Sequence, residues 1–257
     1  MGKIITISLV TLRESLRNRL FIGLLIFLLL FFVFSVYVST LSLGTVARFI
    51  ENTGMVGISL ICLAVSILFG LFTLYQEKER NELYVILNRV PRSSYLIGRF
   101  LGTSCIIALF ALFAGAGIFF LTWSFGGHYT PGLFWAVYWA VLEFTMLTAI
   151  GYLYYALAIS FPLNSLMVLC TYLVGHSMNE AIQSFMGLGR FGSLWHLYLV
   201  KAISVLFPNF DMFDYRLAIV HDEAIPWTQF GLSTLYWFCY LLAVLALTST
   251  IMNRKDM

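Results

Sequence analysis

Long uncharged apolar runs, separated by short polar stretches, dominate this sequence. A helix needs about 20 apolar residues to cross the roughly 30 Å hydrocarbon layer of a membrane. Several runs reach that length, so the pattern predicts six transmembrane helices. Their expected limits are residues 20–41, 55–75, 98–125, 133–161, 164–185 and 227–252.

Two of these helices need a further argument. The first has a longer apolar run than the roughly 7–15 residues of a signal peptide and no clear cleavage site, so we expect it to stay in place. The fifth contains His176 and Asn179 near its end, and its uncharged run stops at Glu180. Pro162 and Asn164 predict a tight turn between the fourth and fifth helices.

The composition supports a membrane protein. The 257 residues are 61% hydrophobic and 11% charged, against about 45–50% and 25% in soluble domains. The predicted fold is therefore an all-α, polytopic membrane helix bundle, with residues 1–257 forming a single transmembrane domain. The net charge of +3 is too small to indicate nucleic-acid binding. The four cysteines lie in apolar stretches without metal-ligand spacing, which favours packing over a disulfide or metal role.

The basic residues predict the orientation. Most of the 15 Lys and Arg residues lie near the chain ends or between the second and third helices, and the opposite side receives only Arg48, Arg190, Lys201 and Arg216. Cytoplasmic segments of membrane proteins are enriched in Lys and Arg. We therefore expect both termini and segment 76–97 to be cytoplasmic, and segment 187–226 to be extracytoplasmic.

Residues 1–19 form an amphipathic pattern. Ile5, Leu9, Leu12 and Leu16 recur at helical spacing, and Arg13, Glu14, Arg17 and Asn18 fall between them. This pattern predicts a helix that lies along the cytoplasmic membrane surface. A plain basic flank that only sets the orientation is the alternative.

Segment 76–97 combines charge with an apolar face. Charges of alternating sign are followed by apolar residues at helical spacing and then by Pro91, which must end or bend the helix. Such a helix can dock on another protein, and a solvated connecting loop would show the same pattern. Gly98 and Gly102 form a Gly-x-x-x-Gly pair, which allows close helix packing but is also common in apolar sequence without any role.

Three motifs together resemble the type-2 ABC transporter permease family. The first is the charged turn followed by Leu83-x-x-x-Leu87, Pro91-Arg92-Ser93 and Gly98-Arg99-x-x-Gly102, in which Arg99 replaces the commoner Lys. The second is Pro208-Asn209-x-x-x-Phe213 before the last helix, similar to the signature of NosY-like members. The third is the amphipathic start that leads into Leu20 and Phe21. The order of the motifs relative to six helices carries the likeness.

The resemblance implies a division of labour between subunits. The chain would be the permease of an ABC transporter, and segment 76–97 would be the coupling loop to a cytoplasmic ABC ATPase. The sequence has no Gly-x-x-x-x-Gly-Lys-Ser/Thr phosphate loop, so ATP and Mg²⁺ would bind to the partner, and this chain would be no enzyme and bind no cofactor. The expected coupling residues are Glu77, Glu79, Arg80, Glu82, Leu83 and Arg92. The expected assembly is a homodimer in the cytoplasmic (inner) membrane of a prokaryote. An extracytoplasmic accessory protein is a further partner that the resemblance allows.

Two further sites are candidates. Glu143 lies near the middle of the fourth helix, where an ionised carboxylate costs about 3 kcal/mol or more, so it either lines a translocation path or makes a structural hydrogen bond. Segment 187–226 should form interfacial helices at the outer leaflet, and Pro208, Asn209 and Phe210 are outer gate candidates by the resemblance. Several acids and a histidine in this segment lack regular metal-ligand spacing, so we predict no metal site for Asp211, Asp214, His221, Asp222 and Glu223.

The predicted function is ATP-driven transport, as export, through a separate ATPase. A non-transporting membrane anchor that passes ATPase work to an extracytoplasmic partner stays open, as does a secondary transporter, although Glu143 is the one clear midplane charge and no repeat is evident. An intramembrane enzyme is disfavoured because no catalytic motif is present. The sequence does not indicate the substrate.

Overall fold

The computed structural model describes residues 2–41, 46–80, 90–126, 132–187, 207–215, 219 and 227–254, with the backbone alone for 178–187. Every regular element in these residues is helical, which confirms the all-α prediction. The elements are α1 (Gly2–Arg17), α2 (Arg19–Thr40), α3 (Val46–Val65), the π-helix η1 (Ser66–Phe72), α4 (Thr73–Glu79), α6 (Arg92–Ser124), α7 (Gly132–Ala156), α8 (Phe161–Gly187), the 3-10 helix η2 (Phe210–Phe213) and α11 (Trp227–Arg254).

Five helical segments of the described chain are long and apolar enough to cross a membrane. They are α2, the helix Val46–Glu79 that joins α3, η1 and α4, and then α6, α7 and α11. The membrane-helix character is thereby confirmed. α8 coincides with the predicted fifth span but is not among the five, since polar residues such as His176, Asn179 and Glu180 interrupt its apolar sequence. The count of six spans therefore stays a prediction.

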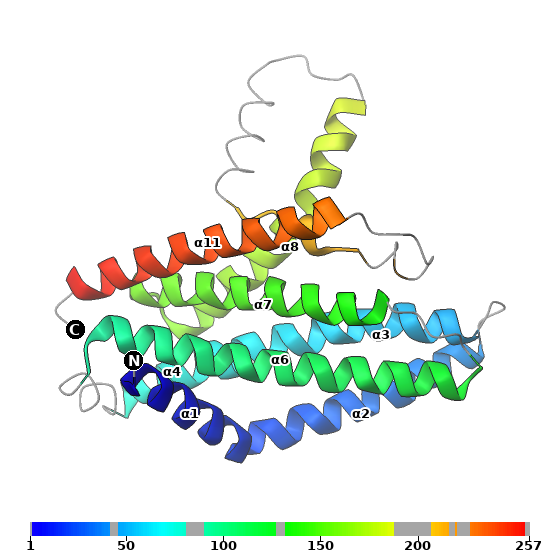
Figure 1. Cartoon of the computed structure of the whole chain (residues 1–257), viewed down its shortest axis with the longest axis horizontal. Helices are drawn as coiled ribbons and strands as arrows, with labels where there is room; N and C mark the ends of the chain where they lie inside the picture. The colour runs from blue at the N-terminus through cyan, green and yellow to red at the C-terminus, as the bar shows by residue number, and fades with distance from the viewer. Residues whose placement is uncertain are drawn as a thin grey trace.

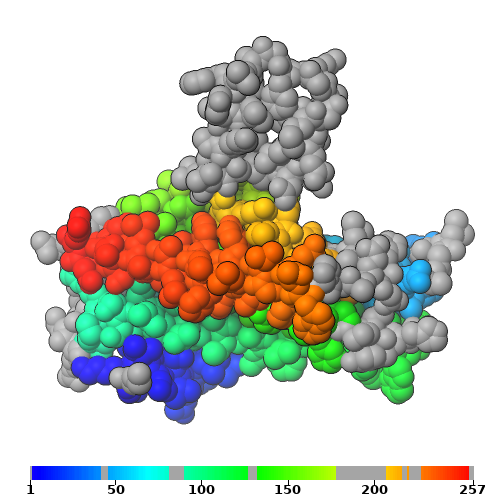
Figure 2. Space-filling model, turned by 45° about the horizontal axis from the view of Figure 1, so that its top comes forward, coloured from blue at the N-terminus to red at the C-terminus, as the bar shows by residue number. Residues whose placement is uncertain are grey.

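The five long helices run side by side, with α6 and α7 central (Figure 1). α6 packs against α1, α3 and α7, and α7 also packs against α8 and α11. In the most apolar stretch of α7, 72% of the residues are buried inside the chain. The corresponding share is 17% in α2 and in α11. Figure 2 shows α11 spread along the surface, with α6 beside it and α1 on the far side of α6. α2 and α11 are therefore the helices of the five that the rest of the chain covers least.

Segment 76–97 has helical stems. Residues 76–79 belong to α4, and residues 92–97 form the first turns of α6, which begins directly after Pro91. Both helices therefore extend beyond the predicted limits of spans two and three. Residues 81–89, which include Glu82 and Leu83, lie outside the described residues.

The turn between α7 and α8 lies earlier than the sequence suggests. The chain reverses at Ala158, which has a positive φ of 65°. The Ala158 N–H donates to the Tyr155 carbonyl at 2.9 Å, and the Ile159 N–H donates to Tyr154 at 3.5 Å, the two bonds of a Schellman helix end. Pro162 instead lies in the first turn of α8, where a proline needs no N–H. The prediction that Pro162 and Asn164 form the break was therefore wrong.

A π-helical stretch, η1, interrupts the second span. The Ser66 and Thr148 hydroxyls are 2.8 Å apart across the contact with α7. A Cβ atom on Gly70 would lie 2.9 Å from the Thr148 methyl group, so the absence of a side chain allows this close approach. The polar pair and the small residue together fix the irregular turn against the central helix.

The cysteines take two kinds of position. Cys62 is buried in the core, whereas Cys105, Cys170 and Cys239 are exposed free thiols on helix surfaces. Of the four, Cys62 alone fits the predicted packing role.

Candidate functional site

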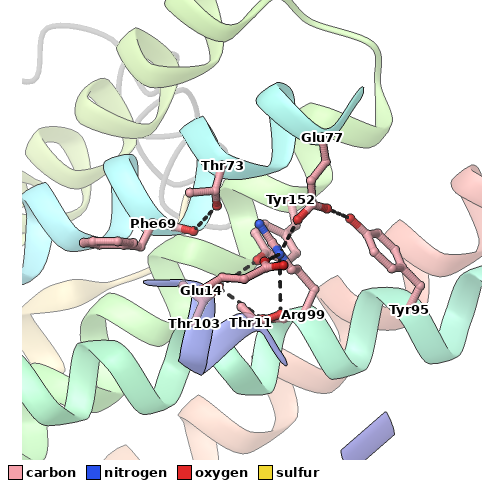
Figure 3. A network of polar contacts seen from close by, with 9 residues as sticks. All are labelled: Thr11, Glu14, Phe69, Thr73, Glu77, Tyr95, Arg99, Thr103 and Tyr152. Carbon is pink, nitrogen blue, oxygen red and sulfur yellow. Dashed lines mark hydrogen bonds and ion pairs between the residues drawn. The ribbon is translucent and has the colours of Figure 1, made fainter. Parts of the chain in front are cut away.

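A buried ion pair joins the two stems of segment 76–97 (Figure 3). Glu77, in the last turn of α4, pairs with Arg99 in the second turn of α6. The Tyr95 hydroxyl, one turn earlier on α6, donates a hydrogen bond to the other oxygen of the same carboxylate. Both ends of the segment are therefore tied to each other at one carboxylate.

The pair is withdrawn from solvent. Arg99 exposes 4% of its surface and Glu77 9%. Charges buried to this degree persist in proteins because they are paired and hydrogen-bonded, and removing one partner leaves the other uncompensated. The ion pair therefore constrains how α4 and α6 can move relative to each other.

The N-terminal helix docks beside this pair through two glycines. A Cβ atom on Gly98 would lie 2.9 Å from the Ile4 carbonyl oxygen, and one on Gly102 would lie 2.7 Å from the Thr11 Cβ. Arg99, between them in sequence, lies 3.4 Å from the Thr11 hydroxyl and 3.8 Å from the Glu14 carboxylate. The Gly-x-x-x-Gly pair thus serves close packing, and the neighbour that it admits is α1.

The orientation of α1 separates its two faces. Thr11 and Ser15 are buried toward α6, while Ile5, Leu9 and Leu16 are 59%, 59% and 41% exposed. The predicted amphipathic helix is therefore present, with small polar residues at the protein contact and most of the apolar stripe facing outward. Its place at a membrane surface stays a prediction.

The other expected coupling residues take different positions. Glu79 and Arg80 are exposed at the end of α4. The Arg92 guanidinium donates to the Met252 carbonyl at 2.6 Å, so it binds the C-terminal end of α11. Cations stabilise helix C-termini in this way. Among the predicted coupling residues, Glu77 and Arg92 are thus engaged inside the protein.

A second polar cluster surrounds Glu143. The His176 Nε2 atom lies 2.6 Å from a Glu143 oxygen, and the His176 Nδ1 atom lies 3.7 Å from an Asp211 oxygen. The three residues come from α7, α8 and η2. Glu143 is 3% exposed. Glu143 therefore makes a hydrogen bond within the bundle, but its partner is the His176 imidazole, whereas the sequence led us to expect a hydroxyl or a backbone carbonyl.

The Pro208-Asn209-Phe210 segment is packed against α8 and α11. Phe210 is fully buried, and a Cβ atom on Gly175 would lie 2.8 Å from the Pro208 carbonyl oxygen. The Asn209 side chain caps η2 by accepting from the Asp211 N–H at 3.1 Å. The Tyr236 hydroxyl of α11 accepts from the Asn209 N–H at 3.0 Å. The outer gate candidates thus lie directly beside the Glu143 cluster.

In the described part of the chain, no three His, Cys, Asp or Glu side chains lie close enough together to coordinate one metal ion. Asp211 instead contacts His176, and Asp214 is exposed. His221, Asp222 and Glu223 lie outside the described residues.

Sequence reasoning missed several members of both clusters. Tyr95, Thr11 and Glu14 were not expected beside Arg99, and His176 and Asp211 were not expected to share a cluster with Glu143. Glu77 lies at the start of segment 76–97 and Arg99 two residues after its end, so their opposite charges were the one signal available for the first cluster. No sequence pattern links Glu143, His176 and Asp211 of the second cluster, because these residues lie far apart along the chain.

The fold and these clusters define an all-helical protein of membrane type, in which ionisable side chains join several of the helices that the structure describes. A scan of the sequence against protein-family models finds no match, and a search of curated proteins likewise finds no matching sequence.

Proposed function

We propose that this chain is the membrane permease subunit of an ABC transporter, which couples ATP hydrolysis by a separate ATPase subunit to the export of a substrate. Two copies of the chain would form a homodimer in the inner membrane of a prokaryote, with both termini cytoplasmic. ATP and Mg²⁺ bind to the ATPase. The motif order of the sequence and the apolar helices both support this assignment.

The observation that carries the proposal is the buried Glu77–Arg99 pair at the base of segment 76–97. A loop that only connects two helices needs no such tie. A loop that receives a push from a partner needs stems that move as a unit, and Glu77 provides this by binding Tyr95 and Arg99 at once.

Contacts around the segment would also transmit its movement to other helices of the bundle. α1 follows α6 because it is packed on Gly98 and Gly102. α11 is attached at its C-terminal end because Arg92 binds the Met252 carbonyl. Movement of the segment would therefore shift α1, α4, α6 and α11 together.

Glu143 is the translocation path candidate in this proposal. Its cluster with His176 and Asp211 joins α7, α8 and the outer gate segment Pro208-Asn209-Phe210. Hydrogen bonds between separate helices can rearrange when those helices move. The polar groups of the cluster could then contact a polar substrate, which apolar side chains could not do.

Co-purification tests the proposal. The tagged chain, isolated from its native membrane, should bring down an ATPase subunit, and the Glu79→Ala/Leu83→Ala double variant should lose both the subunit and the ATPase activity. The matched control is Trp123→Ala/Ser124→Ala, at the opposite end of α6. If no protein with a nucleotide-binding domain is recovered with the folded chain from intact membranes, the assignment is wrong.

A further inference from the structure

A polar cavity of about 270 Å³ lies between α1, α4 and α6, next to the buried ion pair. Glu14 and Ser15 of α1, Gln76 and Arg80 at the end of α4, and Arg99 of α6 contribute to its lining. A single water molecule needs roughly 10–15 Å³ measured in this way. The cavity is therefore large enough for a small polar group of several heavy atoms.

Arg99 brings a guanidinium to the lining of this cavity. Its Nε atom is buried and has no hydrogen-bond partner among the residues that the structure describes. The other end of the guanidinium is occupied by Glu77 and Thr11. Because the Nε atom is closed off from solvent, it is out of reach from the open cavity, and Arg99 contributes its positive charge to the lining instead.

The charges of the lining are balanced. Glu77 and Arg99 neutralise each other inside. Glu14 is 63% exposed on the α1 wall, and Arg80 is exposed on the α4 wall. The rim therefore offers one carboxylate and one guanidinium from opposite sides, which suits a zwitterion better than an anion.

The cavity lies where a lipid headgroup would lie. Its lining includes Asn18, which caps the start of α2, and Gln76, close to the end of the second span. Both positions mark ends of membrane-crossing helices. Leu16 and Ile22, which flank the α1–α2 junction, are 41% and 58% exposed, so exposed apolar surface for acyl chains lies close in sequence to the lining residues Ser15 and Asn18.

We propose that this cavity binds the headgroup of a phospholipid with a primary ammonium, of the phosphatidylethanolamine type. A phosphate oxygen accepts from Arg80 near the positive charge of Arg99, and the ammonium donates to Glu14. The bound lipid fills the space between α1 and α4 and so supports the docking of the N-terminal helix. The proposal does not depend on the transport function.

Native mass spectrometry of the full chain tests it. The delipidated protein in detergent is incubated with equal amounts of dioleoyl phosphatidylethanolamine, phosphatidylcholine and phosphatidylglycerol. The ethanolamine lipid should be retained about tenfold more than the other two, a factor that one charge-assisted hydrogen bond supplies. A trimethylated ammonium has no N–H to donate, and phosphatidylglycerol has no cation for Glu14. A large excess of soluble glycerophosphoethanolamine should not displace the lipid, because it lacks acyl chains.

Two matched pairs of variants complete the test. Glu14→Gln should abolish the preference for ethanolamine over choline, whereas Glu79→Gln, an exposed acid that does not line the cavity, should leave it unchanged. Arg80→Gln should weaken the binding of all three lipids, whereas Arg13→Gln should leave their binding unchanged. Equal retention of the three lipids by the parent chain would overturn the proposal, and so would cavity variants that behave like their controls, since the cavity would then hold water alone. Full displacement by the soluble headgroup would overturn the assignment to a lipid.

Discussion

Glu77 and Arg99 show how one residue pair can organise a whole end of the protein. Each is nearly withdrawn from water, and each has further polar neighbours: Tyr95 on one side, and Thr11 and Glu14 on the other. A buried ion pair is not in itself a large source of stability, because desolvation of the two charges offsets their attraction. Its effect is to make the arrangement specific, since any other packing of α4 on α6 would separate buried charges.

Breaking this pair from one side should therefore destabilise the fold strongly. We expect Glu77→Gln or Arg99→Gln alone to lower the free energy of unfolding by about 3–5 kcal/mol, because the remaining charge stays buried without its counterion. Thermal unfolding in detergent, followed by circular dichroism, measures the effect.

The double variant Glu77→Gln/Arg99→Gln provides the control for this prediction. It should lose less than the sum of the two single losses, because it leaves no unpaired charge. Additive losses would mean that the two side chains contribute independently and that the pair does not constrain the stems.

Among the elements, α1 and α6 have the closest relationship. α1 has 16 residues, and most of the stability of a helix in a protein comes from tertiary packing, so it depends on its partner. The partner surface is made by glycines: the Ile4 and Ser8 carbonyls of α1 approach Gly98 and Gly102 at distances that a Cβ would violate. α1 is thus held by close backbone packing against α6 and by contacts with Arg99. Most of its apolar stripe remains exposed on the outer face.

A side chain at Gly102 should release α1. We expect Gly102→Leu to speed trypsin cleavage after Arg13 and Arg17 by about tenfold or more, because proteolysis follows the population of the undocked helix, and each 1.4 kcal/mol changes that population tenfold. The N-terminal fragments are followed by mass spectrometry.

Gly23→Leu, in α2, is the matched control for this prediction, since no atom lies within 4 Å of a Cβ built there. It should leave the cleavage rate unchanged. Equal acceleration by both variants would indicate a general loosening, and no acceleration by Gly102→Leu would mean that α1 is not held at this position.

In the whole molecule, both ends of the described chain lie at the same end of the helix bundle, and the C-terminal end of α6 lies at the other (Figure 1). This arrangement agrees with the charge pattern, which puts most basic residues near the termini and the stems of segment 76–97. Topology in membranes follows that bias. The two ends of the bundle should therefore differ in accessibility from outside the cell.

Cysteine labelling tests this orientation. In a background with the four native cysteines replaced by alanine, Ser124→Cys should react with a membrane-impermeant maleimide in intact cells. Lys3→Cys and Arg254→Cys should react only after permeabilisation, because the termini are expected to be cytoplasmic. Labelling of either terminal position in intact cells would reverse the predicted orientation.

The helical class and most of the helix positions follow from the sequence, because an apolar run of about 20 residues has few options other than a membrane helix. Boundaries were less predictable. Arg92 and the polar start of α3 belong to helices although they lie outside the apolar runs, because hydropathy alone does not decide where a helix begins. The turn at Ala158 was missed because a positive φ in a non-glycine residue leaves no mark in the sequence.

The sequence by itself determined the all-helical membrane character, the amphipathic first helix and the presence of a small-residue pair in α6, since each depends on local composition and spacing. Only the tertiary structure decided that α1 is the partner of that pair, that Arg99 binds Glu77 and that His176 reaches Glu143. These contacts join residues on different helices. Periodicity along a helix states which face is apolar, but which neighbour covers that face depends on how all the helices pack at once.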